Sequence, residues 1–408
     1  MIKFLILLLP VLICAEDLRS LLKHAVDNND LVLSYNLSQE AKAKEVQARK
    51  SAYYPTLDVG ANYQSLNERS PYMPGDAYSG YAKLGLDIYD GGKKSSMLEQ
   101  KEYELKASGF DVEAMKTSIT LQIIQDFFTV KSLEASLSSR HEAKVSLQAQ
   151  LNRMQQFYDA KLATIDDVDR LQAAYDTNIY EIESLKMQIL STKRSLALKV
   201  GKPVKSLDES KFKEILQDDY ELVDSTKSLM AQEEAIISSA ESIDSAYYPQ
   251  LRVEDTYSLY GYDRTDALHP EGAERQNKVM LTLNLRLFDN GSVHNEKQAV
   301  MISSQALNKQ IAYQEKEQKM QHDLALSRIN TSKAKIKSAK SALKSSQSAF
   351  KTIEEKYNAG IVDNVVYLDA LSSQTSAKAL YQASLNDLEI AYATYYYYAG
   401  KNIGEFLQ

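Results

Sequence analysis

Five histidines and one glycine-lysine run are the residues whose types could support metal or phosphate chemistry. The histidines are His24, His141, His269, His294 and His322. Their spacing does not match that of metal ligands, and no Glu lies between a suitable pair. The run 91–95, Gly-Gly-Lys-Lys-Ser, is similar to a phosphate-binding loop but lacks the first Gly and has Lys where Ser or Thr should follow the Lys. We interpret it as a strand-to-helix turn and expect no metal, no cofactor and no enzyme activity.

Composition describes a folded chain with few interruptions. Of 408 residues, 44% are apolar and 25% charged, while 14 Gly and 7 Pro make up about half of their usual share. Long uninterrupted elements are therefore expected. The formal net charge is −7, and the Lys and Arg residues are dispersed, so we expect no nucleic-acid partner.

The first fifteen residues have the pattern of an export signal. Lys3 precedes an apolar run from Phe4 to Cys14, and Ala15 is followed by acidic residues. We expect a signal peptide over 1–15, ending either by cleavage after Ala15 or by lipid attachment to Cys14, the only cysteine. No later run of 18 apolar residues occurs, so any membrane crossing by the mature chain would need strands.

Three sequence landmarks occur twice, in the same order and at nearly the same spacing. Tyr-Tyr-Pro-Thr-Leu at 53–57 returns as Tyr-Tyr-Pro-Gln-Leu at 247–251. Leu-Asp-Ile-Tyr-Asp-Gly-Gly at 86–92 returns as Leu-Arg-Leu-Phe-Asp-Asn-Gly at 285–291, and Tyr-Asp-Ala-Lys at 158–161 returns as Tyr-Asn-Ala-Gly at 357–360. A period this long indicates a duplicated half. We expect a first structural repeat over 16–203 (helix, β-hairpin, long helix, helix), a connecting segment over 204–220 and a second repeat over 221–408.

Each half contains two stretches that alternate between apolar and polar residues. They lie near 57–64 and 83–88 in the first half, and near 251–259 and 279–287 in the second. Asp255 interrupts the apolar face. Strands of about ten residues with one apolar side suit a membrane β-barrel, with aromatic residues at the lipid interface. The expected interface aromatics are Tyr53, Tyr54, Tyr89, Tyr247, Tyr248 and Phe288.

Four strands per chain are too few to close a barrel. Single-chain barrels begin at eight strands, whose interior is filled by side chains. A trimer giving a 12-stranded barrel is the smallest cyclic assembly with room for a solute. The sequence itself does not count subunits.

Two long stretches without proline set the length of the helices. Residues 92–158 and 291–357 would each form a rod of roughly 100 Å at 1.5 Å per residue. Shorter helices are expected over 17–52 and 164–200. In the second rod Ile329, Ile336, Leu343 and Phe350 repeat as a heptad, typical of coiled coils. The lysines from 333 to 351 lie mostly off this stripe, and we interpret them as a solvated face.

Together these motifs resemble the TolC-like outer-membrane efflux protein family. The similarity rests on the duplicated half, Ala-x-Tyr-Pro at 52–55, strands that end in Leu-x-x-(Tyr/Phe)-Asp-x-Gly, and the Tyr-x-x-Gly turn at 357–360. It implies a mainly α fold with a membrane β-barrel contribution: long antiparallel coiled-coil helices form an α-barrel, and a homotrimer has twelve strands. Asn29-Asp30 and Lys161 depart from the family's usual Asn-Pro and Gly.

The resemblance also implies a function and partners. The family supplies an exit duct in the outer membrane, extending into the periplasm, for multidrug efflux or type I secretion. Its closed inner end opens when a periplasmic adaptor (membrane fusion) protein and an inner-membrane pump of RND or ABC type dock. Other expected contacts are with outer-membrane lipid, and the cargo, small molecules or protein, stays open.

By alignment with that family, the residues after each helix turn are gate candidates. Asp369 matches a position lining the constriction, and Val366 stands where the family has a second acidic residue. Tyr357 and Asp167 match a pair that links helices in the closed state, while Val362 replaces a basic residue. Asp167 and Asp363 could equally be helix caps.

Two non-channel classes remain open on sequence grounds. A periplasmic coiled-coil scaffold would account for the rods but would not need two alternating hairpins. A surface adhesin of trimeric coiled-coil type would have its barrel at one end only.

Overall fold

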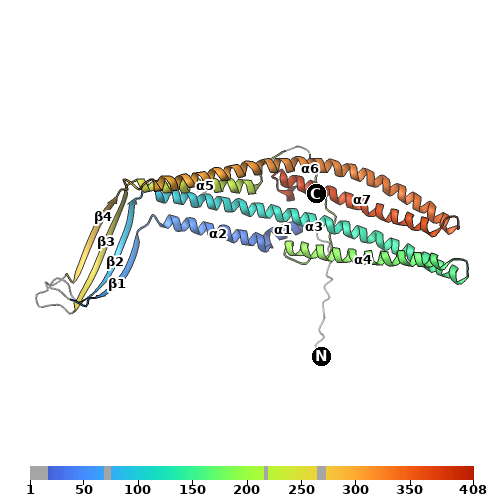
Figure 1. Cartoon of the computed structure of the whole chain (residues 1–408), viewed down its shortest axis with the longest axis horizontal. Coiled ribbons are helices and arrows are strands. Elements are labelled where there is room, and N and C mark those ends of the chain that lie inside the picture. The colour runs from blue at the N-terminus through green and yellow to red at the C-terminus, as the bar shows by residue number, and fades with distance from the viewer. Residues whose placement is uncertain (1–16, 69–74, 216–218, 264–272) are drawn as a thin grey trace, which may run out of the picture. The chain divides into compact units, whose positions relative to one another are not determined.

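The computed structural model describes residues 17–68, 75–215, 219–263 and 273–408. The predicted signal peptide, with Cys14, lies outside these residues, as do residues 69–74 and 264–272 between the two predicted strands of each half. The elements in chain order are α1 (Leu18–Asn28), α2 (Asp30–Ser51), β1 (Thr56–Ser65), β2 (Asp76–Tyr89), α3 (Lys93–Asp159), α4 (Ile165–Val200), α5 (Asp224–Asp244), the 3-10 helix η1 (Ser245–Tyr247), β3 (Gln250–Asp263), β4 (Arg275–Asn284), α6 (Ser292–Asn358), α7 (Asn364–Tyr398) and the 3-10 helix η2 (Ile403–Phe406). The predicted mainly helical fold with four strands is confirmed (Figure 1).

The chain divides into two compact units. One takes in the segment up to Tyr35 together with Val112–Asp224 and Glu315–Gln408, and the other contains Asn36–Asp111 and Ser225–Gln314. The long helices α3 and α6 contribute to both.

The second unit contains one antiparallel sheet with strand order β1-β2-β3-β4. Leu57 pairs with Leu84, and Val253 pairs with both Leu86 and Leu281. Because paired residues point to the same side of a sheet, the alternating apolar residues form one apolar face, as predicted. Asp255 lies on this face, exposed, in register with Leu84 and Val279.

The prediction of strand over 279–287 was wrong at its end. β4 stops at Asn284, and Leu285 and Leu287 follow it in irregular backbone. The apolar alternation continues past the last ladder partner, since Asn284 already pairs with Gln250, the first residue of β3. Alternation alone therefore could not show where the pairing ends.

Charged side chains tie the polar face of the sheet together near its helix-proximal end. Arg252 contacts Asp87 at 2.8 Å and Glu254 at 2.9 Å, and Lys94 at the start of α3 reaches Asp87 at 3.2 Å. These pairs join β2, β3 and α3. They show that the sheet's two faces differ in chemistry as the sequence predicted.

Residues 91–95 lead from β2 into α3. This confirms their interpretation as a strand-to-helix turn, which had been preferred over a phosphate-binding loop. Gly91 and Gly92 have φ of +71° and +87°, a left-handed conformation that favours glycine. The Asp90 side chain accepts a hydrogen bond from the Lys94 N–H at 2.8 Å, and Asp289 does the same for Val293 at 2.9 Å. The repeated Asp therefore starts each long helix.

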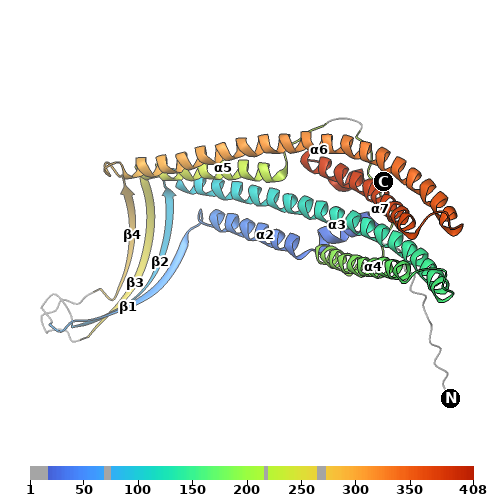
Figure 2. The ribbon, with the colours of Figure 1, turned by 45° about the vertical axis from the view of Figure 1, so that its right-hand side comes forward.

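In the first unit the helices lie side by side in the order α4, α3, α7, α6 (Figures 1 and 2). Lys193 of α4 contacts Glu134 of α3 at 2.6 Å, Lys378 of α7 contacts Glu142 of α3 at 2.5 Å, and Lys335 of α6 contacts Asp387 of α7 at 2.7 Å. A buried core of Ile123, Phe127 and Phe128 from α3 packs with Tyr395 and Tyr396 from α7.

The single helix predicted over 17–52 is wrong, because the chain breaks at Asn29. This residue has extended backbone (φ −72°, ψ 127°), and its side-chain oxygen accepts hydrogen bonds from Leu31 and Val32 at the start of α2. Its amide donates to the Lys199 carbonyl of α4 at 2.7 Å. Asn29-Asp30, which stands where the resembled family often has Asn-Pro, therefore also ends one helix and starts the next.

Candidate functional site

The two helix turns of the first unit, α3 to α4 and α6 to α7, are joined by hydrogen bonds. The Asn364 amide donates to both the carbonyl and the carboxylate of Asp167, each at 3.2 Å. Arg153 of α3 donates to the side-chain and backbone oxygens of Asn358, at 2.5 and 3.0 Å. We call residues 153–169 and 357–369 the tip. Its two turns form one connected surface.

Each turn is closed by a residue in the left-handed conformation. Lys161 has φ of +58° and Gly360 has φ of +73°. In both, the next residue donates back to the preceding helix, Leu162 to Phe157 at 2.8 Å and Ile361 to Lys356 at 2.9 Å. Lys161 therefore adopts the backbone of its glycine counterpart, at a steric cost that glycine avoids.

Two of the predicted gate residues cap helices. Thr164 and Asp167 form a reciprocal capping box at the start of α4, and the Asp363 side chain accepts a hydrogen bond from Val366 N–H at 3.0 Å at the start of α7. Such caps satisfy N–H groups that have no partner within the helix. Asp167 also accepts the bond from Asn364, so it both caps α4 and ties it to α7.

A buried aromatic layer lies behind the turns. Tyr357 stacks on Tyr367, with ring centroids 4.8 Å apart, and Phe350 packs on Tyr367 at 5.7 Å. Burial raises the pKa of Tyr367 to about 12. The pKa of Tyr357 is raised as well, first by burial and further by the charge of Asp167, against the opposing effect of Arg153. Val362 is half-buried against this layer.

The remaining gate candidates are exposed. Val366 is 41% exposed, and Asp369 is exposed within α7, beyond the first turn where a cap would act. Ile361, Val365 and Leu162 add apolar surface to the tip, at 71%, 47% and 76% exposure. The structure thus separates buried tip residues (Tyr357, Tyr367) from exposed ones available to line a passage or meet another chain.

The apolar face of the sheet is a second exposed surface. Val59, Val279, Leu281 and Leu283 are each about two-thirds exposed or more, at 80%, 69%, 65% and 67%. The predicted interface aromatics Tyr53, Tyr54, Tyr89, Tyr247, Tyr248 and Phe288 are all exposed too. They stand where β1 and β3 begin and β2 and β4 end, which is one end of the sheet. An apolar surface this continuous indicates a contact with lipid or protein.

The sequence also matches a known protein family. Residues 21–202 and 224–401 match the family described as outer membrane efflux protein. The chain belongs to this family. Its members are outer-membrane proteins with a transport role, and the family is not one of enzymes.

Individual relatives agree with this membership. The outer membrane protein TolC of Escherichia coli K12 is 26% identical over 166 residues, covering 38% of this chain and 34% of that protein. The match therefore spans about a third of the length of this relative.

Solved structures share the fold over nearly the whole chain. A membrane protein from Pseudomonas aeruginosa superposes with a TM-score of 0.83 at 16% identity, covering 94% of this chain and 93% of that one. The CmeC outer membrane channel of Campylobacter jejuni has a TM-score of 0.83 at 14% identity, covering 95% and 86%. At such low identity these likenesses show the fold alone.

Two further properties of the described residues concern membrane-spanning helices and metal sites. None of the described helices is long and apolar enough to cross a membrane. Across the described residues no three His, Cys, Asp or Glu side chains are placed to hold a metal ion.

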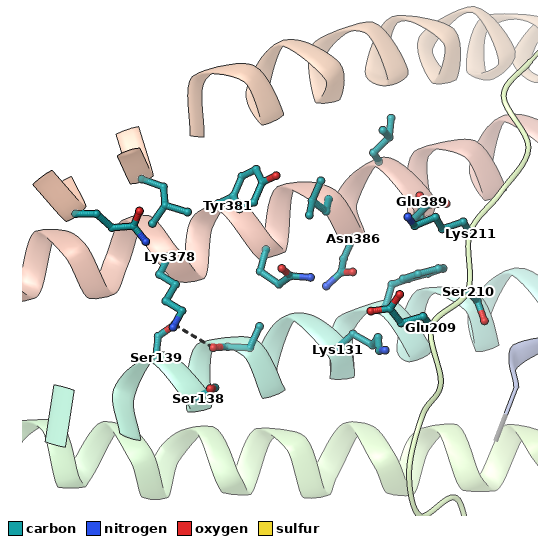
Figure 3. Close-up of a pocket in the computed structure, with 17 residues that line it drawn as sticks. Lys131, Ser138, Ser139, Glu209, Ser210, Lys211, Lys378, Tyr381, Asn386 and Glu389 are labelled. Carbon is teal, nitrogen blue, oxygen red and sulfur yellow. Dashed lines mark hydrogen bonds between the residues drawn. The ribbon is translucent and has the colours of Figure 1, made fainter. Parts of the chain in front are cut away.

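A pocket of about 640 Å³ with a mixed polar and apolar lining lies among α3, α6, α7 and the segment 209–211 (Figure 3). Glu389 of α7 lies at its edge and accepts a hydrogen bond from the Phe212 N–H at 2.7 Å. Burial raises the pKa of the Glu389 carboxyl, partly opposed by this bond and by Lys211. Phe212 also pairs with Leu407 in an isolated β-bridge. Glu389 thus fixes the connecting segment to α7.

Sequence reasoning missed the residues that join the turns. Asn364, Arg153 and Tyr367 contribute the cross-turn bonds and the buried ring, yet each is an ordinary residue for an α-helix. The available signal was the position of Asn364 directly after the cap Asp363. An amide there can donate to a neighbouring helix start.

Proposed function

We propose that the protein is an exit duct: a trimer whose twelve strands form a barrel in the outer membrane and whose helices form a tunnel into the periplasm. The observation that carries this is the pair of open sheet edges. Among the described strands β1 pairs only with β2, and β4 only with β3. Unpaired backbone groups in lipid are costly, so a spanning sheet must close on itself, here through other copies.

The exposed apolar face supports the same assignment. Val59 on β1 and Leu281 on β4 lie on the face opposite Arg252 and Glu254. A barrel with this sheet would place the apolar side toward lipid and the charged side toward water. The six exposed aromatics at the helix-proximal end would lie at the membrane interface.

The helices supply the reach of the tunnel. α3 and α6 have 67 residues each, about 100 Å at 1.5 Å per residue. The tip would form the inner, gated end, with Asp369 and Val366 lining the constriction. Tyr357, Asp167, Asp363 and Val362 would hold the closed arrangement.

The order of elements supports two structural repeats. Two helices (α1 and α2), two strands, a long helix and a further helix occur in 16–203. One helix (α5) followed by η1, two strands, a long helix and a further helix occur in 221–408, with 204–220 connecting the two halves. We infer that each repeat contributes one hairpin to the barrel and one helix pair to the tunnel.

The partners proposed are a periplasmic adaptor and an inner-membrane pump of RND or ABC type. The exposed apolar residues at the tip, Ile361, Leu162 and Val365, offer a docking surface for the adaptor. Cargo of either kind, small molecules or protein, is compatible with such a duct.

The decisive experiment is reconstitution of the full-length protein, purified from outer membranes, into planar lipid bilayers. A duct should give discrete conductance steps and a trimer mass in detergent. A trimer that gives no conductance even after the tip is loosened would favour the scaffold or adhesin alternative. A monomer that extracts without detergent would overturn the membrane assignment.

The partner assignment has its own test. Ile361→Cys offers an exposed thiol at the tip, and cross-linking in intact cells should capture the adaptor or pump. Ser303→Cys, exposed on α6 in the other unit, is the matched control and should capture neither. Equal capture by both sites would contradict docking at the tip.

A further inference from the structure

The two flanks of the first unit carry helix faces that no other described part of the unit covers. In the order α4, α3, α7, α6 the helices α4 and α6 are outermost (Figures 1 and 2). The buried residues of α4, such as Leu171 and Ile182, point toward the unit, and those of α6, such as Ile329 and Phe350, do the same. The opposite faces of both helices are exposed.

The exposed face of α4 carries acidic residues at heptad spacing. Asp169, Asp176 and Glu183 are each seven positions apart, which places them on one stripe of a helix. All three are exposed. Their described contacts are local: Gln172 donates to Asp176 at 2.9 Å, and Lys186 contacts Glu183 at 2.7 Å.

The exposed face of α6 carries basic residues at the same spacing. Lys337, Lys344 and Lys351 are again seven positions apart, and all are exposed. No acidic residue occurs from 324 to 353, so this stretch of α6 cannot neutralise its own lysines. The solvated face expected from sequence therefore has the opposite charge to the face of α4.

The two stripes match in level as well as in spacing. α4 runs away from the tip and α6 runs toward it, so the two would meet antiparallel. Counted from the tip ends of the helices, Lys351 is level with Asp169 to within about one turn. The same offset holds for Lys344 with Asp176 and for Lys337 with Glu183.

Between two of the charged positions, α4 carries a large exposed side chain and α6 has small ones close to the same level. Tyr180 is 72% exposed. On α6 an open groove of about 820 Å³ is lined by Ser341, Ser345 and Ser348, among others. Ser341 lies between Lys337 and Lys344, as Tyr180 lies between Asp176 and Glu183. Large residues can insert into such gaps as knobs into holes.

We propose that α4 of one copy packs against α6 of the next copy through an ion-pair ladder. Its rungs are Asp169 with Lys351, Asp176 with Lys344, and Glu183 with Lys337, and Tyr180 inserts over the Ser341–Ser345 groove. This rests on the proposed trimeric duct and names the residues that join its copies. Within one chain the two faces lie on opposite flanks, so they can meet only between copies.

The ion-pair ladder sets the alignment of α4 against α6 of the next copy, and it adds little to the affinity between the copies. Single exposed ion pairs contribute little and are screened by salt. Charged residues flanking a helix seam, however, select the partner and the alignment. From the register in which these residues pair, a shift by one turn would separate each lysine from its carboxylate, and a shift by one heptad would leave one lysine and one carboxylate without a partner on the other helix.

The test is a pair of cysteines in the full-length protein, Asp176→Cys with Lys344→Cys, treated with a thiol cross-linker of about 8 Å. A disulfide would need Cβ atoms about 4 Å apart, closer than an ion pair requires. Dimers and trimers linked through both sites are expected. Asp176→Cys with Ala342→Cys is the control, because Ala342 is exposed at the same level on another side of α6 and should link several-fold less.

Charge exchange gives an independent readout that does not depend on cysteine geometry. Lys337, Lys344 and Lys351 changed together to Glu should raise the monomer fraction in low-salt detergent several-fold. Adding Asp169→Lys, Asp176→Lys and Glu183→Lys to the same chain should restore the trimer. A merely structural loss on either helix would not be rescued by the second set.

The outcomes separate the ladder from the duct. A conducting trimer with no link above the control, and no rescue by exchange, would overturn the ladder and leave the duct standing. A protein that stays monomeric and non-conducting in every form would overturn both.

Discussion

The side-chain amide of Asn364 on α7 donates to both the carboxylate and the backbone carbonyl of Asp167 on α4, each at 3.2 Å. Asn364 is only 4% exposed. A buried amide bonded to two oxygens of one residue holds two helix starts at a single distance. Separating α7 from α4 at the tip therefore requires these bonds to break.

Asn364→Ala should loosen the tip. The change removes both donors and leaves the Asp167 carbonyl and carboxylate short of a partner, at a cost of about 1–3 kcal/mol. We expect a higher open fraction in planar bilayers and a lower thermal unfolding temperature in detergent. Ser372→Ala, on an exposed position of the same helix, is the control. Equal open fractions in the two variants would show that the Asn364 bonds do not restrain the tip.

Asp369→Asn tests the exposed acidic position on α7. If three copies surround the passage, this residue forms a ring of negative charge that favours cations. We expect weaker cation preference and weaker block by divalent ions, with unchanged stability because the residue is exposed. Asp363→Asn serves for comparison, since its carboxylate caps α7. Unchanged selectivity in Asp369→Asn would remove the residue from the constriction.

Lys161 offers a stabilising substitution. It holds φ of +58° at the turn where its counterpart Gly360 holds +73°. Lys161→Gly should relieve backbone strain of about 1 kcal/mol and raise the unfolding temperature slightly. Gly360→Ala should do the opposite, because a Cβ there meets no atom within 4 Å and only the backbone opposes it. The two unfolding temperatures moving the same way would contradict this account.

Local patterns predicted the elements but not every boundary. Alternation identified all four strands, because one face of the sheet is apolar over most of its length, with Asp255 as an interruption. The same signal overran β4, since Leu285 and Leu287 continue the alternation after the ladder has ended at Asn284. Asn29 was noted as unusual, yet its effect on the helix depends on the Lys199 carbonyl, which is distant in sequence.

The tip shows the same limit for function. Asp167 and Asp363 could be recognised as caps from their positions before the helices. Asp167 also accepts hydrogen bonds from the Asn364 amide. These bonds depend on how α4 packs against α7, which no local sequence pattern indicates. Likewise Tyr367 reads as one more apolar residue in α7, although it is the ring on which Tyr357 stacks.

Leu281→Arg tests which face of the sheet meets lipid. Leu281 is 65% exposed on the apolar face, and an arginine there would cost about 2–4 kcal/mol near the middle of the bilayer. Assembly in the outer membrane should fall sharply, measured as the heat-modifiable form on gels. Met280→Arg lies one residue earlier on the charged face, directly opposite Glu254, and should assemble nearly as the unchanged protein does. The reverse ranking would mean that the two faces have been assigned to the wrong sides.

Glu389 makes stability depend on pH in a defined direction. Burial raises the pKa of its carboxyl above the ordinary value of 4.5, so the folded protein keeps the proton at a pH where the unfolded chain has lost it. Stability from this group is therefore lost as pH rises from about 4.5 through the folded pKa. Glu389→Gln keeps an oxygen for the Phe212 N–H but has no proton to lose. The variant should unfold at a higher temperature than the unchanged protein at neutral pH, with the difference shrinking toward pH 4.

Glu209→Gln, at an exposed position of the same pocket, is the control and should show no such trend with pH. If the difference in unfolding temperature between Glu389→Gln and the unchanged protein grew on acidification, the pKa of Glu389 would be lowered instead of raised.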